Sequence, residues 1–235
     1  MIKILIPIAA LALAASASAT AAAPGGSDYS ACGSAIDAKD PHQRISLYTT
    51  CLKHGGVGGD ATWIFYNRAS AYQLVGEVEK AFQDFNSSIQ YDPTWPNPYV
   101  GRAGIESARG LCNEARADMD KAMKMGPPRA PFLNQAAWIL ATCADPAARD
   151  GRRAIELAQQ ALKVREDSTI RDTLAAAYAE EGQFDLAQAE EVKAIKSAGE
   201  QPARLESMQA RLELYSHGLA FHTRPVSEAA TANGH

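Results

Sequence analysis

Cysteine and histidine are the residues here that most readily form disulfides, metal sites or nucleophilic centres. Cys32, Cys51, Cys112 and Cys143 lack the close pairwise spacing of a zinc site, and no histidine stands at ligand spacing to them. An even number of cysteines is typical of disulfide-bonded exported proteins, and four cysteines allow three pairings. We expect disulfides and no metal; the alternative is that Cys143 is a small buried residue with a free thiol.

The histidines do not form a catalytic or metal-binding pattern. They stand toward the two ends of the chain, at His42, His54, His217, His222 and His235. His217 and His222 are too far out of helical register to share one face of a helix. Nucleophile-elbow, zinc-protease and phosphate-loop motifs are absent from the sequence, and the glycines at 55–59 indicate a linker. We predict no catalytic residue, no cofactor and no enzyme; an enzyme subunit with an unrecognised site is the least favoured alternative.

Two further sets of charged residues have structural interpretations. The carboxylates of Glu180, Glu181, Glu190 and Glu191 occur as sequence neighbours, which point to different helix faces. We therefore predict a solvated helix surface there. Arg68 and Arg102 either bind a carboxylate of a partner or pair within the protein.

The first residues have the pattern of an export signal. Lys3 precedes an apolar run from Ile4 to about Ala14, and small residues follow to Ala23. Cleavage is expected after Ala19 or Ala21, and the apolar run is too short to span a membrane. We predict a signal peptide at 1–21, an exported, periplasmic or secreted protein, and no integral membrane segment after cleavage. A retained membrane anchor is the alternative.

Length and charge limit the remaining possibilities. The 235 residues suffice for one substantial domain. A net charge of -4 provides no basic stripe for phosphate groups, so nucleic acid is not an expected partner.

An internal repeat dominates the middle of the chain. Residues 62–127 match themselves at a shift of 34, and six of eight marker positions are identical. The identical pairs include Ala69 with Ala103 and Gly76 with Gly110; the others begin at Arg68, Ala81, Asp84 and Pro93. Small residues at such positions allow two helices to cross closely, and proline ends the second helix.

This pattern resembles the tetratricopeptide repeat, most clearly in "YNRASAYQLVGEVEKAFQDFNSSIQYDP". A later copy, "TLAAAYAEEGQFDLAQAEEVKAI", keeps the spacing, with Glu191 in place of the aromatic. A third lies between them and carries an insertion, "ADPAARDG", in its hairpin turn. The resemblance implies an all-α fold: a right-handed superhelical stack of antiparallel helical hairpins, an α-solenoid, with a C-terminal capping helix.

The predicted organisation follows from these copies and from the ends. A flexible segment at 22–28 precedes a degenerate leading hairpin at 29–56, whose second helix starts at Asp40-Pro41. Four repeats then occupy 62–199, at about 62–95, 96–129, 130–167 and 168–199. A capping helix at 202–217 and a flexible tail at 218–235 complete the chain. Cys32 and Cys51 fall on the two helices of the leading hairpin, so we predict a disulfide between them. Stacked hairpins bring consecutive turns together, so we predict a second disulfide between Cys112 and Cys143.

The resemblance implies a protein-binding function. In tetratricopeptide repeats the first helix of each hairpin lines a concave groove that holds a partner polypeptide. The corresponding positions here are Trp63, Tyr66, Ser70, Gln73, Asn97, Val100, Gly104, Asn134, Trp138, Asp172, Ala176 and Glu180. We expect an interaction scaffold of the cell envelope whose partner is a protein or peptide. Self-association into an architectural assembly is the alternative, and Trp63 and Trp138 have the alternative role of packing between hairpins.

Overall fold

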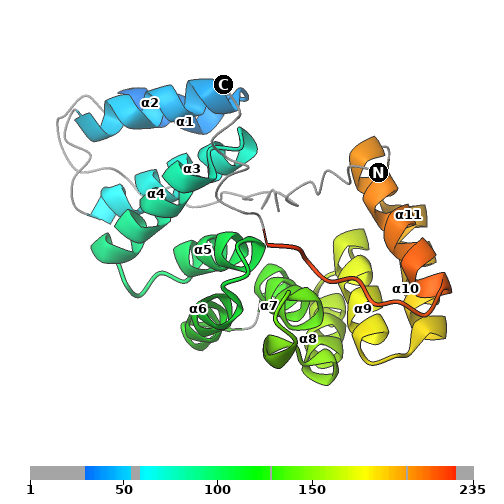
Figure 1. Cartoon of the computed structure of the whole chain (residues 1–235). Coiled ribbons are helices and arrows are strands. Elements are labelled where there is room, and N and C mark those ends of the chain that lie inside the picture. The colour runs from blue at the N-terminus through cyan, green and yellow to red at the C-terminus, as the bar shows by residue number, and fades with distance from the viewer. Residues whose placement is uncertain (1–29, 54–58, 128, 200, 226–235) are drawn as a thin grey trace. The chain divides into compact units, whose positions relative to one another are not determined.

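The computed structural model describes residues 30–53, 59–127, 129–199 and 201–225, and this part of the chain is entirely helical and irregular, without strands (Figure 1). It forms two compact units that divide between Arg102 and Ala103, within one helix. We call them the N-terminal and C-terminal units and describe each by itself. The predicted fold class of antiparallel helical hairpins is confirmed.

The N-terminal unit begins with a short hairpin. Helix α1 spans Ser30–Asp37 and α2 spans Pro41–Lys53. Asp40 starts α2, because its carboxylate accepts the backbone N–H of Gln43 at 2.9 Å. The predicted disulfide between Cys32 and Cys51 joins the two helices. Their apolar sides meet the next helix in a cluster formed by Ala35, Tyr48, Cys51 and Ile64.

The first full hairpin follows, from α3 (Gly59–Leu74) and α4 (Val78–Tyr91). Ala69 and Ala81 are fully buried, which allows the close crossing that the repeat predicts. Gly76 takes a positive φ of +79° in the turn, a conformation that side chains disfavour. The unit ends in α5 (Asn97–Ala108), where Gly101 lies so close to the Phe85 ring that an added Cβ would stand 2.4 Å from it.

The C-terminal unit contains the rest of α5 and six further α-helices. These are α6 (Cys112–Lys124), α7 (Ala130–Thr142), α8 (Gly151–Val164), α9 (Ser168–Glu180), α10 (Phe184–Ser197) and α11 (Pro202–Ser216). Each packs against the next, and α7 also packs against α9, the first helix of the following hairpin. The last helix covers α10, as a capping helix should. Among the described helices, none combines the length and apolar character needed to cross a membrane.

The insertion in the third hairpin folds into a defined turn. A short 3-10 helix, η1 (Pro146–Ala148), begins where Asp145 accepts the backbone N–H of Ala147 at 2.9 Å. Asp150 then starts α8 by accepting the N–H of Arg153 at 2.9 Å. The second predicted disulfide, Cys112 to Cys143, ties the start of α6 to the end of α7, next to this turn.

Two predictions differ from the structure. Leu219–Pro225 belong to the predicted flexible tail, yet Thr223 of this stretch hydrogen-bonds to Thr142 of α7. The predicted solvated carboxylate surface is wrong at Glu191, which is fully buried, and at Glu180 and Glu190, whose side chains are mostly buried and paired with arginines. Neighbouring helices bury these carboxylates, and the residue pattern of one helix does not indicate that burial.

Several predicted segments lie outside the described residues. They are the signal peptide at 1–21, the segment 22–28, most of the glycine-rich linker, and the chain end after Pro225.

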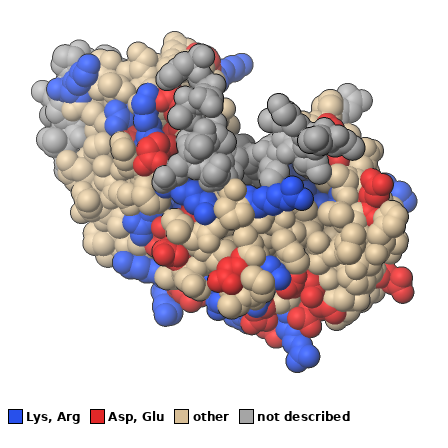
Figure 2. Space-filling view, in the orientation of Figure 1, with Lys and Arg blue, Asp and Glu red and all other residues tan. Residues whose placement is uncertain are grey.

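On the face shown in Figure 2, Lys and Arg side chains are interspersed with Asp and Glu side chains over much of the surface.

Candidate functional site

The candidate site lies in the C-terminal unit, where α7, α9 and α11 present side chains to one stretch of chain. We call it the inner face and define it by Trp138 of α7, Asp172 and Glu180 of α9, and Arg211 of α11. Trp138 and Glu180 each contact the chain that follows α11, and Arg211 contacts Trp138 and Asp172. Three residues predicted for the groove, Trp138, Asp172 and Glu180, are thus brought together.

The chain that follows α11 crosses this inner face. We call residues Leu219–Pro225 the C-terminal segment; it has no helical structure and is drawn in red in Figure 1. The Phe221 ring lies 5.9 Å from the Trp138 ring, centroid to centroid, and the Arg211 guanidinium stands 5.6 Å from both rings. An aromatic side chain of the segment is therefore seated against an aromatic and a cation of the face.

The backbone of the C-terminal segment is held at the end of α7. The N–H of Thr223 donates to the carbonyl oxygen of Thr142 at 2.7 Å, and the Thr223 hydroxyl donates to the same oxygen at 3.0 Å. Carbonyls in the last turn of a helix lack partners within the helix, so this oxygen is available. A hydrogen bond to the main chain of this kind can hold an extended polypeptide of any sequence that has an N–H at that position.

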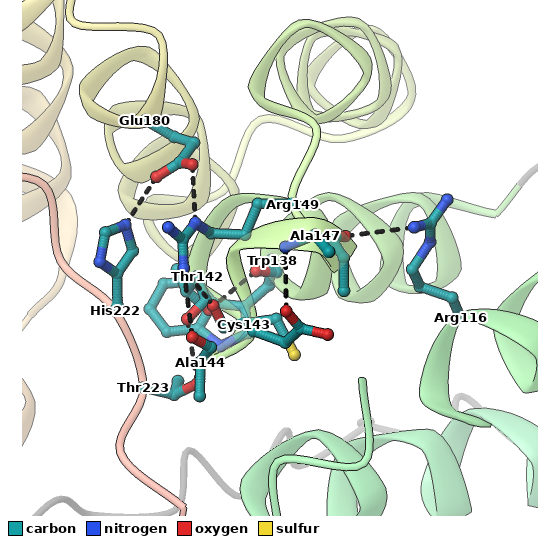
Figure 3. Close-up of polar contacts among 12 residues, drawn as sticks. Arg116, Trp138, Thr142, Cys143, Ala144, Ala147, Arg149, Glu180, His222 and Thr223 are labelled. Carbon is teal, nitrogen blue, oxygen red and sulfur yellow. Dashed lines mark hydrogen bonds and ion pairs between the residues drawn. The ribbon is translucent and has the colours of Figure 1, made fainter. Parts of the chain in front are cut away.

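His222 and Arg149 approach one carboxylate from two sides, as Figure 3 shows. His222 Nε2 lies 2.6 Å from Glu180 Oε2, and Arg149 Nε donates to Glu180 Oε1 at 2.7 Å. Arg149 also donates to the carbonyl of Cys143 at 2.9 Å. The inserted turn therefore supplies the arginine that orients Glu180 toward the C-terminal segment.

Beneath the inner face lies a buried charged cluster. Arg211 binds both carboxylate oxygens of Asp172, at 2.8 and 2.9 Å, and its Nε is 3.6 Å from Glu191 Oε1. Burial, and then the negative charge of Asp172, raise the pKa of Glu191 to about 10. The Glu191 carboxyl is therefore protonated and neutral at pH 7, which limits the cost of burying two acids beside one arginine. Burial likewise raises the pKa of Tyr215.

Three further predicted groove residues belong to the C-terminal unit. Gly104 approaches Gln135 of α7, Asn134 is buried one turn before Trp138, and Ala176 is buried between the turns of Asp172 and Glu180. Asn134 Oδ1 is buried without a hydrogen-bond partner among the described residues.

The predicted groove residues of the N-terminal unit contact other residues of that unit, and Trp63 is at the same time 36% exposed. Trp63 meets the Tyr48 ring edge-on at 5.7 Å, and Tyr66 stands 4.8 Å from Trp95. Val100 is buried. The remaining three, Ser70, Gln73 and Asn97, are partly exposed, and the Ser70 hydroxyl donates to the carbonyl of Tyr66.

The arginines that recur in the first two repeats pair within the protein, which is one of the two roles that the sequence allows. Arg68 donates to both oxygens of Asp84, at 2.7 and 2.8 Å. Arg102 donates to the amide oxygen of Asn86 at 2.7 Å. Neither arginine is therefore assigned to a partner carboxylate.

Sequence reasoning missed six residues of the site: Thr142, Arg149, Arg211, Phe221, His222 and Thr223. One signal was available, because Leu219-Ala220-Phe221 is an apolar triplet just after the last helix. Phe221 and Ala220 indeed pack against the cluster formed by Ala175, Ala179, Ala187 and Tyr215. No group of three or more metal-ligating side chains gathers in the described part of the chain.

Comparison with known proteins supports the repeat interpretation. No family model matches the chain. Tetratricopeptide repeat protein 34 of Mus musculus is 30% identical over 106 residues, which is 45% of this chain and 17% of the mouse protein. The match therefore spans well under one fifth of that relative.

Solved structures extend the likeness across most of the chain. A tetratricopeptide repeat protein from Parabacteroides merdae has a TM-score of 0.61 at 12% identity, over 81% of this chain and 72% of that one. The fold is that of tetratricopeptide repeat proteins. A thermophilic example from Thermus thermophilus has a TM-score of 0.57 at 19% identity, covering 75% and 91%. YrrB, described as having an unusual peptide-binding site, has a TM-score of 0.51 at 18% identity, covering 74% and 88%.

Proposed function

We propose that this protein is an exported tetratricopeptide repeat scaffold of the cell envelope that binds an extended segment of a partner polypeptide. The binding site is the inner face formed by α7, α9 and α11, with Trp138, Glu180 and Arg211 as its principal side chains. The fold supports this, because its hairpins present the first helix of each repeat to a ligand.

A single observation carries the proposal: the inner face already holds a non-helical stretch of polypeptide. The C-terminal segment places a ring against Trp138, an imidazole against Glu180 and a backbone N–H on the Thr142 carbonyl. A ring–ring contact, a hydrogen bond to a carboxylate and a main-chain hydrogen bond are interactions by which proteins bind extended peptides. A partner strand with matching groups fits the same place.

Export is supported by independent features. The first residues have the pattern of a signal peptide, and both pairs of cysteines form disulfides, which persist in oxidising compartments. A binding role is favoured over catalysis because the acids Asp172 and Glu191 are buried beside Arg211, where a substrate has little access to them.

Photo-crosslinking in cells tests the proposal. We would place a photoreactive amino acid at position 138 of the full chain, with its native signal, and the same amino acid at the exposed position 206 of α11 as a control. We expect a partner polypeptide to be captured from position 138 and not from 206. Equal capture at both positions, or none at 138, would contradict the assignment of the inner face; capture only of a second copy of this chain would favour self-association.

A further inference from the structure

The three contacts of the C-terminal segment fall on consecutive residues, Phe221, His222 and Thr223. Each residue makes a different kind of contact. Phe221 contributes an aromatic ring, His222 an imidazole nitrogen that contacts a carboxylate, and Thr223 an N–H and a hydroxyl that both donate to one carbonyl oxygen. Side chains that alternate along an extended chain reach different neighbours in this way. The inner face is therefore a row of three adjacent subsites.

Those subsites belong to rigid parts of the C-terminal unit. Trp138 and the Thr142 carbonyl are one turn apart on α7, whose end is tied to α6 by the disulfide of Cys143. Glu180 is held by Arg149, and Arg211 is held by Asp172. The receptor groups are consequently positioned without help from the C-terminal segment.

The segment itself is held far less firmly than the helices around it. The side chain of His222 is 37% exposed, against 17% for its partner Glu180, and Arg224 and Pro225 are exposed. Ala220 and Phe221 pack against the core cluster, but the segment has few hydrogen bonds, and the contact of His222 lies at the surface. A segment bound this way exchanges with a competing strand more readily than a core element unfolds.

We propose that the C-terminal segment is a built-in competitor for the inner face, and that the partner strand carries the same pattern of an aromatic residue, a base and a residue with backbone and hydroxyl donors. This rests on the proposed function and specifies its ligand. Tethering gives the segment a local concentration in the millimolar range, so a partner must displace it. The bound segment therefore sets the threshold for binding.

Peptide binding to the full chain tests this. The probe is a fluorescently labelled peptide of residues 219–225, Leu-Ala-Phe-His-Thr-Arg-Pro, and the readout is fluorescence anisotropy. The variant F221A/H222A releases the segment in cis, and we expect it to bind the probe at least about 10-fold more tightly than the unmodified chain. R224A, which alters an exposed side chain of the same segment, is the matched control and should bind as the unmodified chain does.

Two altered probes test the contributions of the individual subsites. A probe in which alanine replaces the phenylalanine, and a second in which alanine replaces the histidine, should each bind F221A/H222A at least about 5-fold more weakly. T223P, which removes both the N–H and the hydroxyl donor in cis, provides a second way to release the segment. Circular dichroism of each variant verifies that the helices are retained.

Equal affinity of the unmodified chain and both release variants for the probe, or no binding to either variant, would overturn the proposal. A dimer that becomes monomeric in F221A/H222A would also overturn it, since the segment would then belong to a neighbouring copy. Crosslinking from position 138 separates the two claims. If partner capture persists while the probe fails, only the competitor is wrong; if the probe binds and no partner is captured, the proposed scaffold is wrong.

Discussion

The first helices of the repeats carry predicted groove residues that are used differently in the two units. In α3 of the N-terminal unit, Trp63 and Tyr66 pack on Tyr48 and Trp95, residues of that unit's own hairpins. In α7 of the C-terminal unit, Trp138 meets Phe221, which comes from beyond the last helix. Aromatic residues of the first helices therefore have different kinds of neighbour in the two units. What such a side chain does depends on which segment covers it.

The arginine–carboxylate pairs differ in the same way. Arg68 binds Asp84 within one hairpin, 16 residues apart. Arg211 binds Asp172 across 39 residues, with Glu191 of a third helix beside it, and its guanidinium also faces Trp138. Arg68 also donates to Thr49 of α2, so each arginine joins three helices. The second differs in lying beside two buried acids and in supporting the inner face.

The largest expected effect tests this difference in stability. Replacing Arg211 with methionine leaves Asp172 and Glu191 buried without a cation, and should lower the free energy of unfolding by about 3 to 5 kcal/mol. The matched change Arg68→Met leaves the single buried carboxylate of Asp84 without its cation and should cost about 2 kcal/mol. Urea unfolding followed by circular dichroism measures both. A larger loss in Arg68→Met would contradict the comparison.

Removal of each disulfide comes next. Replacing both cysteines of either pair with alanine should cost about 3 to 4 kcal/mol, because the closed loops of 19 and 31 residues are similar in size. Only C112A/C143A should also weaken probe binding in the F221A/H222A background, because Cys143 follows the Thr142 carbonyl. If C32A/C51A weakened probe binding equally, the site would not be confined to the C-terminal unit.

The pH dependence of stability tests the buried cluster. An unfolded glutamate has a pKa near 4.3, so the raised pKa of Glu191 stabilises the folded state fully below that pH. This contribution declines as the pH rises toward about 10, by at most about 1.4 kcal/mol per pH unit. Glu191→Gln should therefore gain about 2 kcal/mol over the unmodified protein between pH 6 and pH 8. Glu206→Gln, an exposed control, should show no such trend; a flat difference for Glu191→Gln would mean that Glu191 is ionised in the fold.

The smallest effect compares the two tryptophans directly. In the F221A/H222A background, Trp138→Ala should weaken probe binding about 10-fold, or about 1.4 kcal/mol, because the ring of the probe loses its partner. Trp63→Ala should leave probe binding unchanged. Anisotropy titrations measure both, and an equal loss from Trp63→Ala would show that the probe contacts the N-terminal unit.

Local spacing made much of the fold predictable. The shift of 34 placed the small residues Ala69 and Ala81 at a close helix crossing, and Asp40 before Pro41 indicated the start of α2. The disulfide of Cys32 and Cys51 followed from the two helices of one hairpin and that of Cys112 and Cys143 from the adjacency of turns in stacked hairpins, and both are present. Each of these inferences depends on residues of one hairpin or of neighbouring hairpins.

The candidate site was only partly predictable. Trp138, Asp172 and Glu180 were identified as groove positions because they fall on first helices at the family spacing. Arg149 was not identified, since an inserted turn has no counterpart in the other repeats. Glu191 occupies an aromatic position of the repeat, and its burial follows from that position; the neighbouring glutamates made it resemble a solvated surface instead.

The sequence by itself determined the period, the helix boundaries and which cysteines stand near one another, because these depend on short separations along the chain. Only the tertiary structure decided that Thr223 binds Thr142, 81 residues away, and that His222 meets Glu180, 42 residues away. No repeat period relates such residues. They meet because the helices between them fold back and leave an unpaired carbonyl and a carboxylate on a face that the end of the chain can reach.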